Sequence, residues 1–145
     1  MNVFVVENSM NLHDGLRSVL SGMHEVNMVG HAVNESGAIE RINALLPDAV
    51  MLDLGLQSGS GIGVLEWIKK HHAKIKVMVF THYTDEHCID RCKSAGAEYF
   101  FDRNSQLAQA RKLLWKLAQA GPGNHHGKRL PQSNDAPTIH HRAWK

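Results

Sequence analysis

The sequence predicts an α/β fold in which helices cover both faces of a parallel five-stranded sheet, and three observations support this prediction. Five short apolar runs alternate along the chain with longer stretches of helical periodicity. The runs at 3–6 and 49–52 are continuous rather than alternating, which is typical of strands buried on both faces. Glycine or proline stands where several of the helical stretches end. The pattern indicates a flavodoxin-like, doubly wound (βα)5 fold with strand order 2-1-3-4-5.

Each element follows from its local pattern. The predicted strands cover residues 3–6, 26–33, 49–52, 77–80 and 99–101. The predicted helices cover residues 12–20, 38–46, 62–68, 86–95 and 107–120. The run at 26–33 is the less apolar one, so we place it nearer a sheet edge. Gly22, Pro47 and Gly96 end the first, second and fourth of these helices.

Composition and charge indicate one domain followed by a tail. The chain has 145 residues, of which 43% are hydrophobic and 21% charged, as in ordinary globular proteins. Its net charge of +2 is uneven, since residues 121–145 carry +3 and residues 1–120 carry −1. We therefore expect a domain over 1–120 and a flexible, basic, His-containing tail over 121–145. The chain has no apolar run long enough to span a membrane and no basic leader, and its two cysteines suit reduced thiols in a cytoplasmic protein.

Polar residues follow four of the five predicted strands. They are Glu7 and Asn8 after the first strand, Asp53 after the third, Thr81 after the fourth, and Asp102 and Arg103 after the fifth. In open α/β sheets, functional groups gather at the carboxyl ends of the strands. The sequence therefore predicts one pocket that contains carboxylates, a hydroxyl group and a cation.

These residue types suit the phosphorylation of Asp53. A carboxylate is a weak nucleophile, so its attack on phosphorus depends on positioning and on neutralising the phosphoryl oxygens. Mg²⁺ can supply that charge, with Glu7, Asp53 and the Gly55 carbonyl as ligands. Thr81 can donate a hydrogen bond to a phosphoryl oxygen, and Arg103 can pair with another.

Residues 3–118 resemble the receiver domain of bacterial two-component response regulators. The resemblance is carried by the segments 50–56 (VMLDLGL), 59–61 (GSG), 64–65 (VL) and 95–100 (AGAEYF). It implies that Asp53 is the phosphoacceptor and that Glu7 and Asn8 are the acidic pair of the Mg²⁺ site. It also implies a switch formed by Thr81 and the aromatic residue Phe100, and it puts Arg103 at the position of the family's lysine.

The chain departs from the family pattern at three positions. Asn8 stands in place of an acid and brings no charge, which predicts weak Mg²⁺ binding. Arg103 is a planar fork where the family has a compact ammonium group. His82, next to Thr81, is bulky where small residues are frequent, and we interpret it as a modulator of access to Asp53.

The leading hypothesis is a single-domain response regulator, since the chain ends soon after the fifth helix. It would accept phosphate from a histidine kinase or phosphotransfer protein and signal to a downstream protein partner. The alternative is a pseudo-receiver adaptor that binds its partner without phosphorylation. A homodimer through the face of helix 86–95, strand 99–101 and helix 107–120 is a further hypothesis. The only chemistry expected is self-catalysed phosphoryl uptake and hydrolysis at Asp53, and four tail cations without interleaved aromatic residues argue against nucleic-acid binding.

Overall fold

Five parallel strands form the centre of the molecule. The computed structural model describes residues 1–8, 19–20 and 22–120. The strands are β1 (Asn2–Val6), β2 (Asn27–Ala32), β3 (Ala49–Leu52), β4 (Lys76–Thr81) and β5 (Tyr99–Asp102). They pair in the order β2-β1-β3-β4-β5, which confirms the predicted topology and places β2 at an edge. The predicted tail, and most of the helix predicted over 12–20, lie outside the described residues.

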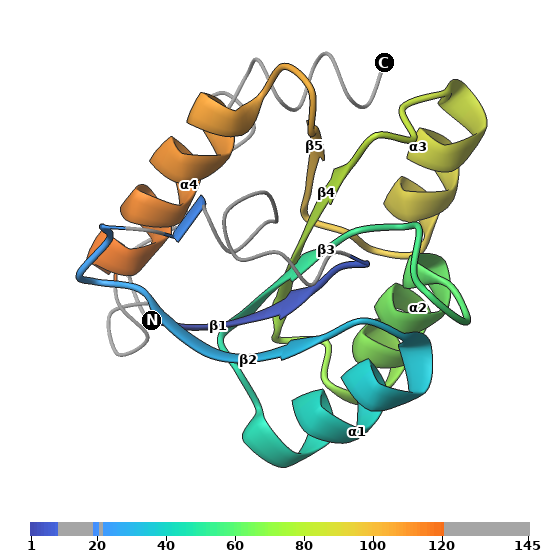
Figure 1. The fold of residues 1–145 in the computed structure, drawn as a ribbon, viewed down its shortest axis with the longest axis horizontal. Helices are drawn as coiled ribbons and strands as arrows, with labels where there is room; N and C mark the ends of the chain where they lie inside the picture. Colours follow the sequence, from blue (N-terminus) through green and yellow to red (C-terminus); the bar gives the residue numbers. More distant parts are fainter. Residues whose placement is uncertain (9–18, 21, 121–145) are drawn as a thin grey trace.

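Helices cover both faces of this sheet. They are α1 (Glu35–Leu45), α2 (Gly61–His71), α3 (Glu86–Ser94) and α4 (Leu107–Ala120). Figure 1 shows α1, α2 and α3 on one side of the sheet and α4 on the other. Alternate residues of each inner strand enter different cores, as Phe4 packs toward the three-helix side and Val5 toward α4. The continuous apolar runs therefore follow from burial of these strands on both faces.

Three helices begin at the carboxyl edge of the sheet, and each begins at a side-chain N-cap. Asn34, Ser60 and Asp85 are the N-cap residues of α1, α2 and α3, and each accepts a hydrogen bond from a backbone N–H of the first turn. The bond donated by the Cys88 N–H lowers the pKa of the Asp85 carboxyl. Gly96 ends α3 in the left-handed region, with a φ of 101°, as the sequence predicted.

The buried thiol of Cys92 predicts a loss of stability at alkaline pH. Burial raises the pKa of Cys92 to about 12, from 9.0 for an ordinary thiol. Above pH 9 the unfolded thiol loses its proton while the folded one keeps it, so the free energy of unfolding falls as pH rises. We expect the loss to reach about 1.4 kcal/mol per pH unit at most. Urea unfolding from pH 8 to 11 under reducing conditions should show a shallower decline in Cys92→Ala, and an unchanged slope would contradict this.

Candidate functional site

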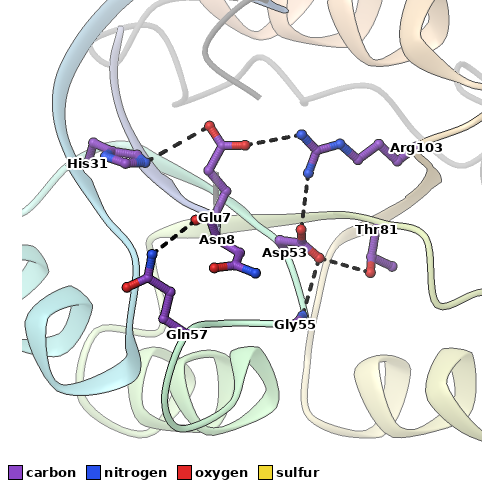
Figure 2. Close-up of polar contacts among 8 residues, drawn as sticks. All are labelled: Glu7, Asn8, His31, Asp53, Gly55, Gln57, Thr81 and Arg103. Carbon is purple, nitrogen blue, oxygen red and sulfur yellow. Dashed lines mark hydrogen bonds and ion pairs between the residues drawn. The ribbon is translucent and has the colours of Figure 1, made fainter. Parts of the chain in front are cut away.

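Asp53 lies at the carboxyl edge of the sheet, directly after β3. Its side chain is nearly buried, with 6% of the residue exposed. Its Oδ1 atom accepts hydrogen bonds from the Thr81 hydroxyl at 3.1 Å and from the Gly55 N–H at 3.3 Å (Figure 2). The Asp53 backbone N–H donates to the carbonyl of Val6 at 2.9 Å, which ties this residue to β1. The carboxylate therefore occupies a fixed position with two donors directed at one oxygen.

Arg103 bridges Asp53 and Glu7. Its Nη1 atom donates to Asp53 Oδ2 at 3.0 Å, and its Nη2 atom donates to Glu7 Oε1 at 3.1 Å (Figure 2). Glu7 is fully buried, and 14% of the Arg103 side chain is exposed. One guanidinium thus faces two carboxylates, and the three groups together carry a net charge of −1. Figure 2 shows the fork between them.

His31, on the edge strand β2, lies on the other side of Glu7 from Arg103. Its Nε2 atom lies 4.0 Å from Glu7 Oε2, the carboxylate oxygen that does not face Arg103. His31 was not among the site residues that the sequence predicted. A signal was present in the sequence, because His31 stands near the end of a predicted strand that borders the first one. Strand β1 indeed pairs with β2, and Val5 lies opposite His31.

Two of the predicted metal ligands, Glu7 and Asp53, are paired with Arg103 in this arrangement. Oxygens of Glu7 and Asp53 already accept from the same guanidinium, so a cation bound between them would face a like charge. Asn8 is exposed, and its backbone carbonyl accepts from the Gln57 side-chain amide at 3.4 Å. Within the described ranges, no group of three or more His, Cys, Asp or Glu side chains can hold a metal ion. The assignment of Glu7, Asn8, Asp53 and Gly55 as ligands stays a prediction.

Tyr83 lies beside the site and directly follows His82 in the sequence. The Tyr83 backbone N–H donates to Thr81 Oγ1 at 3.2 Å. Its ring lies against Gly55, where an added Cβ atom would be 2.9 Å from Tyr83 Cε2. His82 is exposed, and its role in access stays a prediction. Gly55 has no side chain, and this leaves room for the Tyr83 ring. The glycine itself was the signal in the sequence for a close neighbour at this position.

The two predicted switch residues are both in the interior. Thr81 is fully buried, and Phe100 is 1% exposed in the core under α1, α2 and α3. Arg103 follows β5 three positions after Phe100, and its backbone N–H donates to the Thr81 carbonyl at 2.9 Å. The ends of β4 and β5 are thereby joined at the site, although the proposed switching itself stays a prediction.

Comparison with known proteins identifies the family. Residues 3–114 match the model of the response regulator receiver domain. The chain belongs to this family. Receiver domains are typically non-enzymatic apart from their own phosphorylation chemistry, generally use Mg²⁺, and imply a cognate histidine kinase. In the part of this receiver that the structure describes, no helix is both long and apolar enough to cross a bilayer.

Curated relatives of the receiver are two-component response regulators. It is 24% identical over 116 residues to the response regulator protein VraR of Staphylococcus saprophyticus, which covers 80% of this chain and 56% of that protein. It is 26% identical over 100 residues to VraR of Staphylococcus aureus, which covers 69% of this chain and 48% of that protein. The chain therefore spans about half the length of the curated relatives it matches.

Solved structures share the fold at low identity. The signal receiver domain of the response regulator NarL from Mycobacterium tuberculosis matches with a TM-score of 0.72 and 24% identity, over 81% of this chain and 95% of that one. The isolated REC domain of RcsB from Salmonella enterica serovar Typhimurium, solved with the phosphomimetic BeF3-, matches with a TM-score of 0.73 and 20% identity, over 96% and 98%. Both comparisons support the receiver fold described above.

Proposed function

We propose that this receiver accepts a phosphoryl group on Asp53 from a histidine kinase or phosphotransfer protein and then signals through protein–protein contacts. The observation that carries the proposal is the nearly buried Asp53 carboxylate, which accepts from Thr81, Gly55 and Arg103 at once. Asp53 therefore has three hydrogen-bond donors directed at one carboxylate. They also suit the oxygens of a phosphoryl group attached at that place.

The reaction is a transfer between two nucleophiles. A carboxylate oxygen of Asp53 forms a bond to phosphorus while the bond from phosphorus to the donor's histidine nitrogen breaks. The nitrogen leaves with the bonding electrons and takes up a proton, and Asp53 becomes an acyl phosphate. The Thr81 hydroxyl, the Gly55 N–H and the Arg103 guanidinium are the donors available to the phosphoryl oxygens. Attack of water on phosphorus later releases inorganic phosphate and restores Asp53.

The output belongs to the face formed by α3, β5 and α4. Thr81 and Arg103 are joined through the ends of β4 and β5. A phosphoryl group that contacts both residues would therefore affect the position of β5 and of Phe100 within it. We propose that this face binds the downstream protein partner, and that a homodimer can use it too.

A cytoplasmic location is part of the proposal, because receiver domains typically occupy that compartment with their kinases. Action as a single-domain regulator is also part of it, and an immunoblot of the native protein for its size tests that point.

A second candidate function is the pseudo-receiver adaptor, which binds its partner without phosphorylation. The bridge from Arg103 to Asp53 favours it, because an ion-paired carboxylate is a poorer nucleophile. The two functions differ in one measurable property, which is whether Asp53 takes up phosphate.

Phosphoryl uptake should be visible by intact mass. On incubation with phosphoramidate, the wild-type protein should gain one phosphate adduct, and Asp53→Asn should gain none because an amide cannot form the acyl phosphate. Thr81→Ala should still react but should lose a large part of the rate, about tenfold or more, because one donor to the transferring group is missing. A matched control is Asp85→Asn, which changes an exposed carboxyl at the start of α3. An adduct that persists in Asp53→Asn, or none in wild type with any donor or kinase, would favour the adaptor.

A further inference from the structure

We propose that Arg103 is the resident cation of the phosphoryl site around Asp53. Its guanidinium pairs with Glu7 and Asp53 together, so Mg²⁺ must displace it in order to bind, and phosphoryl uptake does not depend on the metal. The second half of this proposal rests on the proposed function, whereas the first half concerns the unphosphorylated protein alone. Weak Mg²⁺ binding, which Asn8 predicted from the sequence, then follows from the position of Arg103 instead.

The forked guanidinium of Arg103 reaches two carboxylates at once. Nη1 lies 3.0 Å from Asp53 Oδ2, and Nη2 lies 3.1 Å from Glu7 Oε1, so two nitrogens of one group serve two carboxylates. The carboxylates follow different strands, β1 and β3, which pair side by side. A lysine ammonium at this position would be a single point of charge and could not offer the same fixed pair of donors. The bridge is therefore a property of arginine at this position.

The three charged groups of this bridge are largely buried. Glu7 is fully buried, Asp53 is 6% exposed, and the Arg103 side chain is 14% exposed. Interactions among such groups are screened far less than those at a surface. A divalent cation that approached the same oxygens would meet the guanidinium at close range, and only one net negative charge would be left to attract it. Asn8, which is exposed and uncharged, adds none.

Contacts with β4 hold Arg103 in place. The Arg103 backbone N–H donates to the Thr81 carbonyl at 2.9 Å, and the guanidinium carbon lies 6.0 Å from the centre of the Phe80 ring. The Phe80 ring is itself packed edge-on against Phe101, with 6.1 Å between the ring centres. A cation over the face of an aromatic ring is stabilised further. Displacement of the guanidinium would therefore break its two ion pairs and its contact with the Phe80 ring.

The same fork can serve a phosphoryl group. Guanidinium N–H groups match phosphate oxygens as they match carboxylate oxygens, and the charge lies where it is needed when Asp53 reacts. Arg103 would then supply in this chain the positive charge that a metal supplies in the family generally. No step of the transfer needs a further cation in this scheme.

The metal half of the proposal is tested by Mg²⁺ titration without a phosphodonor. Calorimetry and the thermal midpoint should show very weak binding to wild type up to millimolar Mg²⁺. Arg103→Lys keeps the charge but loses the fork, and Arg103→Gln loses both; each should bind Mg²⁺ about tenfold more tightly than wild type. Asn8→Asp adds an acid but leaves the bridge, so its gain should be smaller than that of Arg103→Lys. Tight binding to wild type, or a gain in Asn8→Asp but not in Arg103→Lys, would overturn the proposal.

The phosphoryl half is tested by intact mass with phosphoramidate, in EDTA and in excess Mg²⁺. Wild type should react at the same rate in both, within about twofold, whereas Arg103→Lys should become dependent on Mg²⁺. Uptake by wild type only with Mg²⁺ would overturn the inference and leave the proposed function standing. No uptake by wild type in either condition, or from a kinase, would defeat the proposed function, and the titration above would still decide whether Arg103 excludes the metal. Arg103→Lys retains the charge, so the test does not depend on whether Arg103→Gln folds.

Discussion

Replacing Gly61 by alanine should destabilise this receiver by roughly 3 kcal/mol and disturb the phosphoryl site. Gly61 is the first residue of α2, and its N–H donates to the Leu54 carbonyl at 3.0 Å. A Cβ atom there would press on the Asp53 carbonyl oxygen and lie 2.7 Å from the Leu54 Cα atom. Both neighbours are backbone atoms of the segment that holds the phosphoacceptor, so neither can move without moving Asp53. Urea unfolding should show the loss of stability, and intact mass should show slower phosphoryl uptake.

Gly63→Ala is the matched control, in the same helix and two residues further along. A Cβ atom at Gly63 would also be crowded, at 2.6 Å from the Glu35 Cδ atom, but that neighbour is the end of a flexible side chain. Glu35 can move away at the cost of its hydrogen bond to the Ser60 N–H, and alanine favours the helix over glycine by about 1 kcal/mol. We expect Gly63→Ala to stay within about 1 kcal/mol of wild type. Equal losses in the two variants would contradict the assignment of the effect to the backbone at Asp53.

The sequence predicted the fold well because the strands have a simple physical signature. Residues 3–6 and 49–52 are continuously apolar, since β1 and β3 are central and buried on both faces. The weaker pattern at 26–33 matches β2, which is an edge strand. Helix ends were also predictable where glycine was required, as at Gly96. These features depend on local pattern and burial, and both can be read from sequence.

The site was predictable as a set of residues but not as a set of contacts. Strand ends bring Glu7, Asp53, Thr81 and Arg103 together in any fold of this topology. The bridge from Arg103 to both carboxylates depends on side-chain paths that only the packed structure determines. Thr81 is the last residue of β4 and is buried, whereas His82 lies beyond the end of that strand and is exposed. Adjacency in sequence therefore favoured His82, whereas the ring beside Gly55 belongs to Tyr83.

Replacing Arg103 by alanine should cost about 3 kcal/mol of stability, because it removes the guanidinium that pairs with both buried carboxylates, Glu7 and Asp53. Glu7 and Asp53 are 0% and 6% exposed, so water can compensate little of this loss. Asp53→Asn alone should cost far less, since Arg103 and Glu7 remain as a neutral pair at 3.1 Å. Urea unfolding of the two single variants and the double variant measures the difference.

The double variant separates charge from packing. If repulsion between the carboxylates causes the loss, Asp53→Asn should restore about half of it in the Arg103→Ala background, because only one buried charge then remains. If the loss comes from the contact of Arg103 with the Phe80 ring, Asp53→Asn should restore nothing. The first outcome would mean that burial of the Asp53 carboxylate lowers the stability of the protein and that Arg103 offsets this loss. It would then follow that a phosphoryl group on Asp53, which adds negative charge at the same place, is stabilised by the same residue.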